Sequence, residues 1–403
     1  MSTIYTENSQ KEVKMGLYVH IPFCKQKCYY CDFYSEIGQT KKSEQLIDKI
    51  ISDLDCKINL LNVDIIDSIF IGGGTPSLLT PDDLHRLLEG IKKTIPNIPT
   101  EVSIEANPES LTKVHLDILK DSIVNRLSLG IQTFNNKVLE TLNRPTREED
   151  IIRVLEEIND YRDKININFD FITGLPDQSY YDIKRDVNLV KEYNPEHISL
   201  YSLMIEEEAP LYRLVQKGFI KLPDEDLDRE LFNSFRTELN NLGYDKYEIS
   251  NYSKPGKYSK HNTNYWYLNP YIGVGPGAVS FYNDEKGKPI RIKNSYLNDY
   301  LNNNKSSIQE MILLQDFVFE NIMMSLRLTK GIEDSIFKRR FGYPLKYIYP
   351  KTVERLLSAK KIVYNKGYYS IPEHQIDFTD NIIADFLNEE PSNITNLDWT
   401  WEG

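Results

Sequence analysis

Three of the four cysteines in this sequence, Cys24, Cys28 and Cys31, stand within eight residues of one another. Thiols this close along the chain cannot all form disulfides, and the fourth cysteine, Cys56, lies apart from them. In a reducing compartment, such a group is typical of metal or iron–sulfur ligands. Three thiolates on one short loop can hold three irons of a 4Fe-4S cube, which leaves the fourth iron open for chemistry.

Two alternatives to a cube stay open on the residues alone. His20 with the three cysteines could form a Cys3His zinc site, although structural zinc usually uses two spaced ligand pairs to hold a small domain together. Inert buried cysteines are the second alternative, and the density of thiols counts against it. Cys56 falls opposite the apolar stripe of its expected helix, so we expect a surface thiol there.

Further polar residues follow short apolar segments of the chain. They include the glycine run at 72–74 and the polar side chains Thr75, Glu105, Gln132 and Asp170. The carboxyl ends of parallel strands meet at one rim, so we expect these residues to lie together. Glycines let a backbone approach a ligand closely, but a tight turn explains them equally well. Each polar side chain could also be a satisfied structural group, and their shared location favours a site.

The elements that must position these residues alternate along the first part of the chain. Six short apolar segments predict buried strands, at residues 16–23, 67–74, 101–108, 126–132, 166–176 and 197–205. Amphipathic segments between them predict helices, at residues 42–61, 81–95, 109–121, 147–161 and 178–193. This alternation indicates an α/β fold with parallel strands, as in a partial, TIM-like (β/α)6 barrel.

The alternation ends near residue 243. Residues 244–280 predict irregular structure with short strands, and helices return from about residue 306. A turn at 365–367 between two short strands then favours a smaller, mostly helical, winged-helix-like C-terminal domain. We therefore expect an N-terminal extension (1–15), the barrel core (16–242), a connecting region (243–304), the C-terminal domain (305–387) and a tail (388–403).

Composition limits the classes of protein that the chain can belong to. With 40% hydrophobic and 27% charged residues it is an ordinary globular protein, and its net charge of −12 makes it a poor binder of polyanions. We expect no transmembrane segment and no signal sequence, and hence a cytoplasmic protein. Residues 325–366 hold 11 Lys and Arg against 3 Asp and Glu, a local charge of +8 that leaves −20 on the remainder.

The spacing C-x3-C-x2-C resembles the radical S-adenosylmethionine (radical SAM) superfamily. The wider pattern, with Tyr18, His20 and Phe23 before Cys24 and Tyr30 before Cys31, is similar to the oxygen-independent coproporphyrinogen III oxidase family, over residues 16–387. This resemblance implies a radical SAM barrel in which S-adenosylmethionine chelates the open iron. One electron then cleaves it to methionine and a 5′-deoxyadenosyl radical.

The resemblance also implies roles for the residues at the strand ends. Tyr18, Gly73 and Glu105 match contacts to the cluster-bound S-adenosylmethionine. A second group matches residues that line a second S-adenosylmethionine site in the oxidase: Gly74, Thr75, Gln132, Arg144 and Asp170.

Three departures from the oxidase are similar to the HemW subfamily of heme chaperones. Phe33 stands where the oxidase motif continues with a cysteine, the N-terminal arm is short, and residues 261–266 read H-N-x-x-Y-W. In that subfamily the motif is associated with heme, which implies heme contacts from His261, Asn262, Tyr265 and Trp266. His261 could serve as an axial ligand, and Tyr265 and Trp266 could pack on the macrocycle. On the residues alone, a hydrogen-bonded loop histidine and a small aromatic core explain them as well.

These observations predict a heme chaperone with a 4Fe-4S cluster and S-adenosylmethionine, which hands heme to acceptor hemoproteins. The alternative is an oxygen-independent coproporphyrinogen III oxidase, an enzyme of oxidative decarboxylation. Nucleic-acid chemistry is a third hypothesis, prompted by the basic segment and disfavoured by the acidic whole. An acidic acceptor protein or a peripheral membrane surface suits that segment equally well. A protein that supplies single electrons is a further candidate partner.

Overall fold

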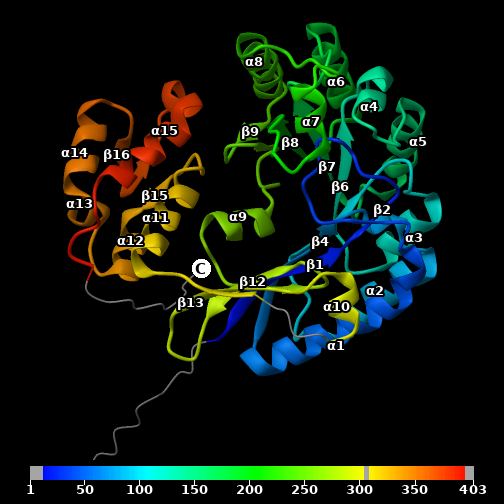
Figure 1. The fold of residues 1–403 in the computed structure, drawn as a ribbon, viewed down its shortest axis with the longest axis horizontal. Coiled ribbons are helices and arrows are strands. Elements are labelled where there is room, and N and C mark those ends of the chain that lie inside the picture. The colour runs from blue at the N-terminus through cyan, green and yellow to red at the C-terminus, as the bar shows by residue number, and fades with distance from the viewer. Residues whose placement is uncertain (1–11, 304–307, 395–403) are drawn as a thin grey trace, which may run out of the picture.

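The computed structural model describes residues 12–303 and 308–394, and Figure 1 shows its fold. Most of the expected N-terminal extension and the last residues of the expected tail lie outside the described residues. At the centre, six parallel strands neighbour one another in chain order. They are β1 (Lys14–Ile21), β4 (Ile65–Gly73), β5 (Glu101–Ala106), β6 (Arg126–Gln132), β7 (Asn166–Thr173) and β8 (His197–Ser202). All six correspond to predicted strands.

The five predicted helices are present and lie along the outer side of the sheet (Figure 1). They are α1 (Ser43–Leu61), α2 (Pro81–Thr94), α3 (Lys113–Asp121), α5 (Glu148–Ile158) and α6 (Tyr180–Tyr193). Along α1, Leu46, Ile47, Ile50 and Leu54 are fully buried, as the apolar stripe of this segment predicts.

Three further helices of this region were not predicted: α4 (Asn136–Thr141), α7 (Pro210–Gln216) and α8 (Glu225–Asn241). Asp224 caps α8 by accepting a hydrogen bond from the amide of Leu227. Phe235 of α8 packs against Phe171 of β7, with 5.1 Å between ring centroids. Because α8 follows β8, it completes the sixth strand–helix unit of a partial (β/α)6 barrel, as predicted.

Later parts of the chain extend this sheet to twelve strands. Strand β11 (Tyr271–Val274) pairs in parallel with β1 and is followed by the antiparallel strands β12 (Val279–Asn283), β13 (Pro289–Lys293) and β14 (Ile308–Met311). At the opposite edge, β10 (Asn251–Ser253) joins β8, and β9 (Asp245–Lys246) joins β10. The region predicted as irregular therefore does hold short strands. It also contains an unpredicted helix, α9 (Lys260–Trp266), and a second one, α10 (Leu297–Leu301), follows later in the expected connecting region.

The C-terminal part is mostly helical and has a hydrophobic core of its own, which includes Phe317, Phe337 and Phe341. Its helices are α11 (Leu314–Ser325), α12 (Asp334–Phe341), α13 (Leu345–Ile348), α14 (Pro350–Ser358) and α15 (Thr379–Ala384). The predicted hairpin is formed by β16 (Val363–Asn365) and β17 (Tyr368–Ser370), beside β15 (Ile332–Glu333). Within the described residues, no helix is both long and apolar enough to cross a membrane.

Candidate functional site

The three clustered cysteines lie on the loop that follows β1. Cys24 ends the short strand β2 (Phe23–Cys24), whose pairing with β3 (Glu36–Ile37) closes the loop that carries Cys28 and Cys31. These three thiols are free and half-buried, whereas Cys56 is free and exposed, as expected. Burial raises the pKa of the Cys24 and Cys31 thiols, so a positively charged metal group is needed to hold them as thiolates at neutral pH.

His20, the fourth donor of the Cys3His alternative, has partners at both ring nitrogens. Its Nδ1 lies 2.9 Å from the Tyr18 hydroxyl, and its Nε2 lies 3.2 Å from the Tyr34 carbonyl oxygen. Among residues 12–303 and 308–394, no three His, Cys, Asp or Glu side chains gather closely enough to hold one metal ion.

A chain of polar contacts links the cysteine loop to the strand ends. Thr75 Oγ1 lies 3.8 Å from Cys24 Sγ and accepts a hydrogen bond from Asn107 Nδ2 at 3.1 Å. Arg144 donates to Asn107 Oδ1 at 3.0 Å and to the Tyr30 hydroxyl at 2.8 Å. Burial lowers the pKa of the Arg144 guanidinium, but the neighbouring Tyr30 and Cys28 raise it above its ordinary value. The guanidinium therefore stays charged. The structure thus brings predicted residues Thr75 and Arg144 together with two of the cysteines.

Two half-buried acidic residues, Glu105 on β5 and Asp170 on β7, lie on central strands of the barrel. Burial raises the pKa of Glu105 to about 7, and the charge of Asp170 adds to this effect. Burial also raises the pKa of Asp170, even though Ser128 Oγ and Asn168 Nδ2 each donate to it at 2.8 Å. Glu105 therefore exchanges its proton near neutral pH. Burial raises the pKa of the Tyr18 phenol, and the nearby carboxylate of Glu105 raises it further.

The glycines after β4 allow the chain to approach itself closely. A Cβ on Gly73, whose φ is +111°, would lie 2.4 Å from the His20 ring, and one on Gly74 would lie 2.6 Å from the Phe23 carbonyl oxygen. The Gly73 amide donates to Glu105 Oε2 at 3.1 Å, and the Gly74 amide donates to the Ile21 carbonyl oxygen at 2.8 Å. These close approaches leave no room for a side chain at either position, which accounts for both glycines by packing.

Gln132 stands where β6 ends, in the left-handed region with a φ of +69°. The pairing of β6 with β7 is irregular between Gly130 and Gln132. A Cβ on Gly130 would come within 3.3 Å of Gln132 Nε2 and within 2.8 Å of Arg144 and Asn107. These side chains therefore converge on one glycine. Asn107 was missed by the sequence analysis, although its place before Pro108 at the end of β5 is a usable signal.

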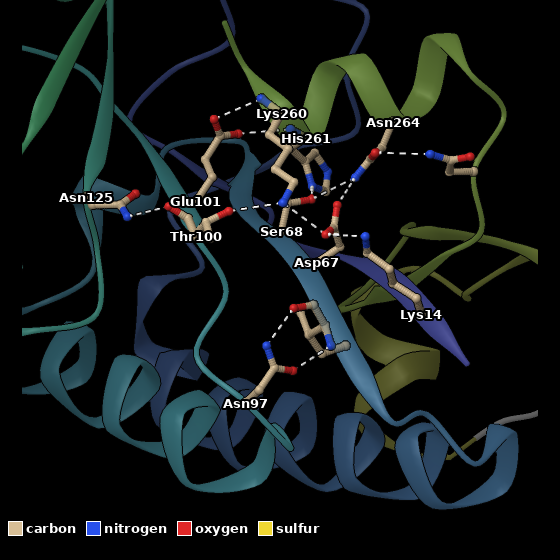
Figure 2. A network of polar contacts seen from close by, with 12 residues as sticks. Lys14, Asp67, Ser68, Asn97, Thr100, Glu101, Asn125, Lys260, His261 and Asn264 are labelled. Carbon is tan, nitrogen blue, oxygen red and sulfur yellow. Dashed lines mark hydrogen bonds and ion pairs between the residues drawn. The ribbon is translucent and has the colours of Figure 1, made fainter. Parts of the chain in front are cut away.

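The H-N-x-x-Y-W segment forms helix α9, which Figure 2 shows beside the first residues of β4 and β5. Glu101 of β5 accepts hydrogen bonds from the backbone amides of Lys260 and His261, both at 2.9 Å. Nδ1 of His261 lies 2.9 Å from Ser68 Oγ, and Nε2 lies 2.9 Å from the Tyr265 hydroxyl. Both ring nitrogens therefore have partners within the protein. Burial lowers the pKa of His261 to about 3, so the ring is neutral.

A second set of contacts holds α9 to β4 (Figure 2). Asn264 Nδ2 donates to Asp67 Oδ2 at 3.1 Å, and Lys14 and Lys260 each lie 3.0 Å from Asp67 Oδ1. Burial raises the pKa of Asp67, but these donors lower it more, so the pKa lies below its ordinary value. Together with His261, they fix the helix and hence the positions of Tyr265 and Trp266.

Beside α9 lies a cavity of about 640 Å³. Three of the four residues predicted to contact heme, Asn262, Tyr265 and Trp266, line it, whereas His261 does not. The other lining residues come from the barrel, the extended sheet and the end of α11: Tyr201, Glu248, Ile249, Ser250, Asn251, Leu268, Asn269, Tyr271, Phe281, Arg291, Met324 and Arg327. Figure 1 shows α9 between the sheet and the C-terminal helices. The sequence analysis did not identify these other residues as a site, because they are dispersed over the chain.

Tyr201 and Tyr265 of the cavity lining are close to the carboxyl groups of the barrel strands. Burial raises the pKa of Tyr201, and the charges of Asp170, Glu248 and Glu105 add to this effect. Burial also raises the pKa of Tyr265, and Tyr271, Tyr18 and Glu105 add to this effect. The cavity wall therefore lies within electrostatic reach of Glu105 and Asp170.

Comparison with known proteins places the chain in a family. Residues 18–190 match the radical SAM superfamily, and residues 312–376 match the HemN C-terminal domain. The fold is similar to that of coproporphyrinogen III oxidase (HemN) from Escherichia coli, with a TM-score of 0.78 and 21% identity over 93% of this chain and 90% of that one.

Curated relatives are more similar in sequence. The heme chaperone HemW of Buchnera aphidicola subsp. Schizaphis graminum is 38% identical over 91% of this chain and 94% of its own. HemW of Bacillus subtilis is 30% identical over 92% of this chain and 99% of its own. HemW of Escherichia coli K12 is also 30% identical, over 93% and 98%. The chain therefore belongs to the HemW family of the radical SAM superfamily.

Proposed function

We propose that this protein binds heme in the cavity beside α9 and hands it to acceptor hemoproteins. The observation that carries the proposal is that Asn262, Tyr265 and Trp266 line one cavity of about 640 Å³. Tyr265, Tyr271 and Phe281 supply flat apolar faces for a macrocycle there. The relatives described above are named heme chaperones, which supports the same ligand.

Cys24, Cys28 and Cys31 would hold a 4Fe-4S cluster, and S-adenosylmethionine would complete its open corner. Such a cluster supplies one electron at a time to the sulfonium of S-adenosylmethionine. On the protein side, Tyr18, Gly73 and Glu105 would border that cofactor. The hydrogen bonds from Arg144 to Asn107 and Tyr30 hold the cysteine loop against the strand ends.

The second group of predicted residues, Gly74, Thr75, Gln132, Arg144 and Asp170, would border a second polar ligand or brace the first. Ser128 and Asn168 orient the Asp170 carboxyl group, which leaves it able to accept hydrogen bonds from a ribose or ammonium group. His261 would act by positioning, since it connects Ser68 to Tyr265 and does not line the cavity.

The test is heme binding and delivery by the anaerobically reconstituted protein. Titration with heme, followed by absorbance, should give saturable binding that Trp266→Ala weakens by about tenfold or more, as expected when a stacked aromatic is removed. The matched control is Tyr347→Ala, an exposed aromatic of α13 outside the cavity. Mixing with an apo-hemoprotein should then transfer the heme absorbance to the acceptor. Absence of saturable heme binding by the wild-type protein would contradict the proposal.

A second candidate is the coproporphyrinogen III oxidase reaction, favoured by the fold shared with that enzyme. Phe33, whose side chain is 67% exposed beside the cysteine loop, stands where the oxidase has a further cysteine and argues against it. Incubation with coproporphyrinogen III, S-adenosylmethionine and a reductant distinguishes the two. Formation of protoporphyrinogen would replace the chaperone proposal by the enzyme.

A further inference from the structure

Two buried hydrogen-bond donors in the cavity have no acceptor among the described residues. They are the indole Nε1 of Trp266 and the guanidinium Nε of Arg327. Both side chains line the cavity, and they are neighbours, because the guanidinium carbon of Arg327 lies 5.9 Å from the Trp266 ring centroid. Buried donors are nearly always paired in folded proteins, so two orphans in one wall indicate that a ligand supplies the acceptor.

Arg327 is the guanidinium of this cavity that remains available. Arg291, which also lines it, is already bound by Glu320 through two hydrogen bonds of 3.0 and 2.5 Å. Arg327 has one long contact of 3.4 Å to Asp380, a side chain that is 78% exposed. That contact uses Nη2, and Nε has no hydrogen-bond partner among the described residues.

The remaining charged lining residue is Glu248, whose two carboxyl oxygens also have no hydrogen-bond partner among the described residues. Its side chain is fully buried, and burial raises its pKa to about 7, although the neighbouring backbone amide of Ser250 and side chain of Asn251 lower it. In its protonated form this carboxyl group donates a hydrogen bond instead of repelling a second carboxylate.

We propose that Trp266 Nε1–H and Arg327 Nε–H together bind a carboxylate of the cavity's ligand. This inference rests on the proposed function: if the ligand is heme, the carboxylate is one of its propionates. A guanidinium with a neighbouring N–H donor matches a carboxylate in charge and in the number of donors. The apolar lining holds the macrocycle, and this pair fixes which edge of the macrocycle points toward α11.

The experiment compares heme with heme dimethyl ester, in which both carboxylates are blocked. Arg327→Gln should weaken heme binding by about tenfold or more, the loss expected for a charge-assisted hydrogen bond, and should leave ester binding within about twofold. Trp266→Phe removes the N–H but keeps an aromatic ring. It should also weaken heme binding more than ester binding, by a smaller factor than Arg327→Gln does. Arg327→Lys should recover part of the heme affinity. The control is Arg355→Gln, a surface arginine of α14 paired with Asp385 at 3.1 Å.

The outcomes separate this inference from the proposed function. If the wild-type protein binds neither compound, both fail. The wild-type protein could bind heme while Arg327→Gln and Trp266→Phe weaken the binding of heme and of the ester equally, or weaken the binding of neither. In either case the carboxylate site is wrong, while heme binding stands. Trp266→Phe removes one N–H and part of the ring, and the comparison of heme with its ester separates the two effects even if Arg327→Gln does not fold.

Discussion

Nε2 of His261 lies 2.9 Å from the hydroxyl oxygen of Tyr265. The other ring nitrogen lies 2.9 Å from Ser68 Oγ, so the imidazole bridges β4 and the last turn of α9. Because the ring is neutral, one nitrogen donates and the other accepts. The histidine of the H-N-x-x-Y-W motif thus acts as a brace for the aromatic residue that faces the cavity.

We expect His261→Gln to leave the absorbance and EPR signals of the ferric heme complex unchanged. The residue lies behind the cavity wall, and glutamine retains a donor and an acceptor. His261→Ala should lower the free energy of unfolding by about 2–4 kcal/mol, because Ser68 and Tyr265 lose their buried partner. A shift of the heme spectrum in His261→Gln would show instead that the imidazole reaches the iron.

Each of Cys24→Ala, Cys28→Ala and Cys31→Ala should abolish incorporation of iron and sulfide on reconstitution. Three cysteines hold three irons of a cube, and loss of one leaves too few ligands. Iron and sulfide analysis and the EPR of the reduced protein measure this. Cys56→Ala is the matched control and should incorporate both normally, since that thiol is exposed on α1. Equal loss of iron in this control would contradict the assignment.

Arg144→Met should lower the free energy of unfolding by about 2–4 kcal/mol, because Asn107 and Tyr30 lose a charged donor. It should also speed the loss of iron from the reconstituted protein, since the arginine braces the cysteine loop. Denaturant titration and the time course of iron release to a chelator measure the two effects. Arg153→Met provides a control, because this half-exposed arginine of α5 pairs with Glu157 away from the loop. Iron release at the wild-type rate would argue against the brace.

Asp186→Asn should flatten the dependence of stability on pH. Burial raises the pKa of Asp186 to about 8, although the Phe134 amide donates to Oδ1 at 2.9 Å. The folded state therefore keeps this proton, and the resulting stability is fully present below about pH 4 and lost as the pH rises through 8. Denaturant titrations at pH 6 and pH 9 should show a smaller difference for the variant than for the wild type. An unchanged difference would mean that Asp186 ionises without cost.

The local pattern of the sequence was sufficient for the central elements. Both ends of β6 were predicted correctly, because a short apolar run between polar segments leaves little choice of where the strand begins and ends. Helix α9 was missed, since its residues have no apolar repeat. It forms because Ser259 caps it and Glu101, far away in the sequence, accepts two of its first amides.

One part of the candidate site could also be predicted from the sequence, and another part could not. The cysteines and strand-end residues follow from spacing and order, since each lies next to an element that the sequence reveals. The cavity depends on packing between distant segments, and nothing local connects Tyr201 to Trp266 or to Arg327. The engagement of both His261 nitrogens is likewise a tertiary fact, because Ser68 lies 193 residues away.

The cavity lies between the C-terminal helices and the barrel, with Met324 and Arg327 on one side and Tyr201 on the other. A ligand bound there contacts both parts of the chain. By mass action it stabilises the folded protein, and the chain should melt at a higher temperature when the ligand is bound.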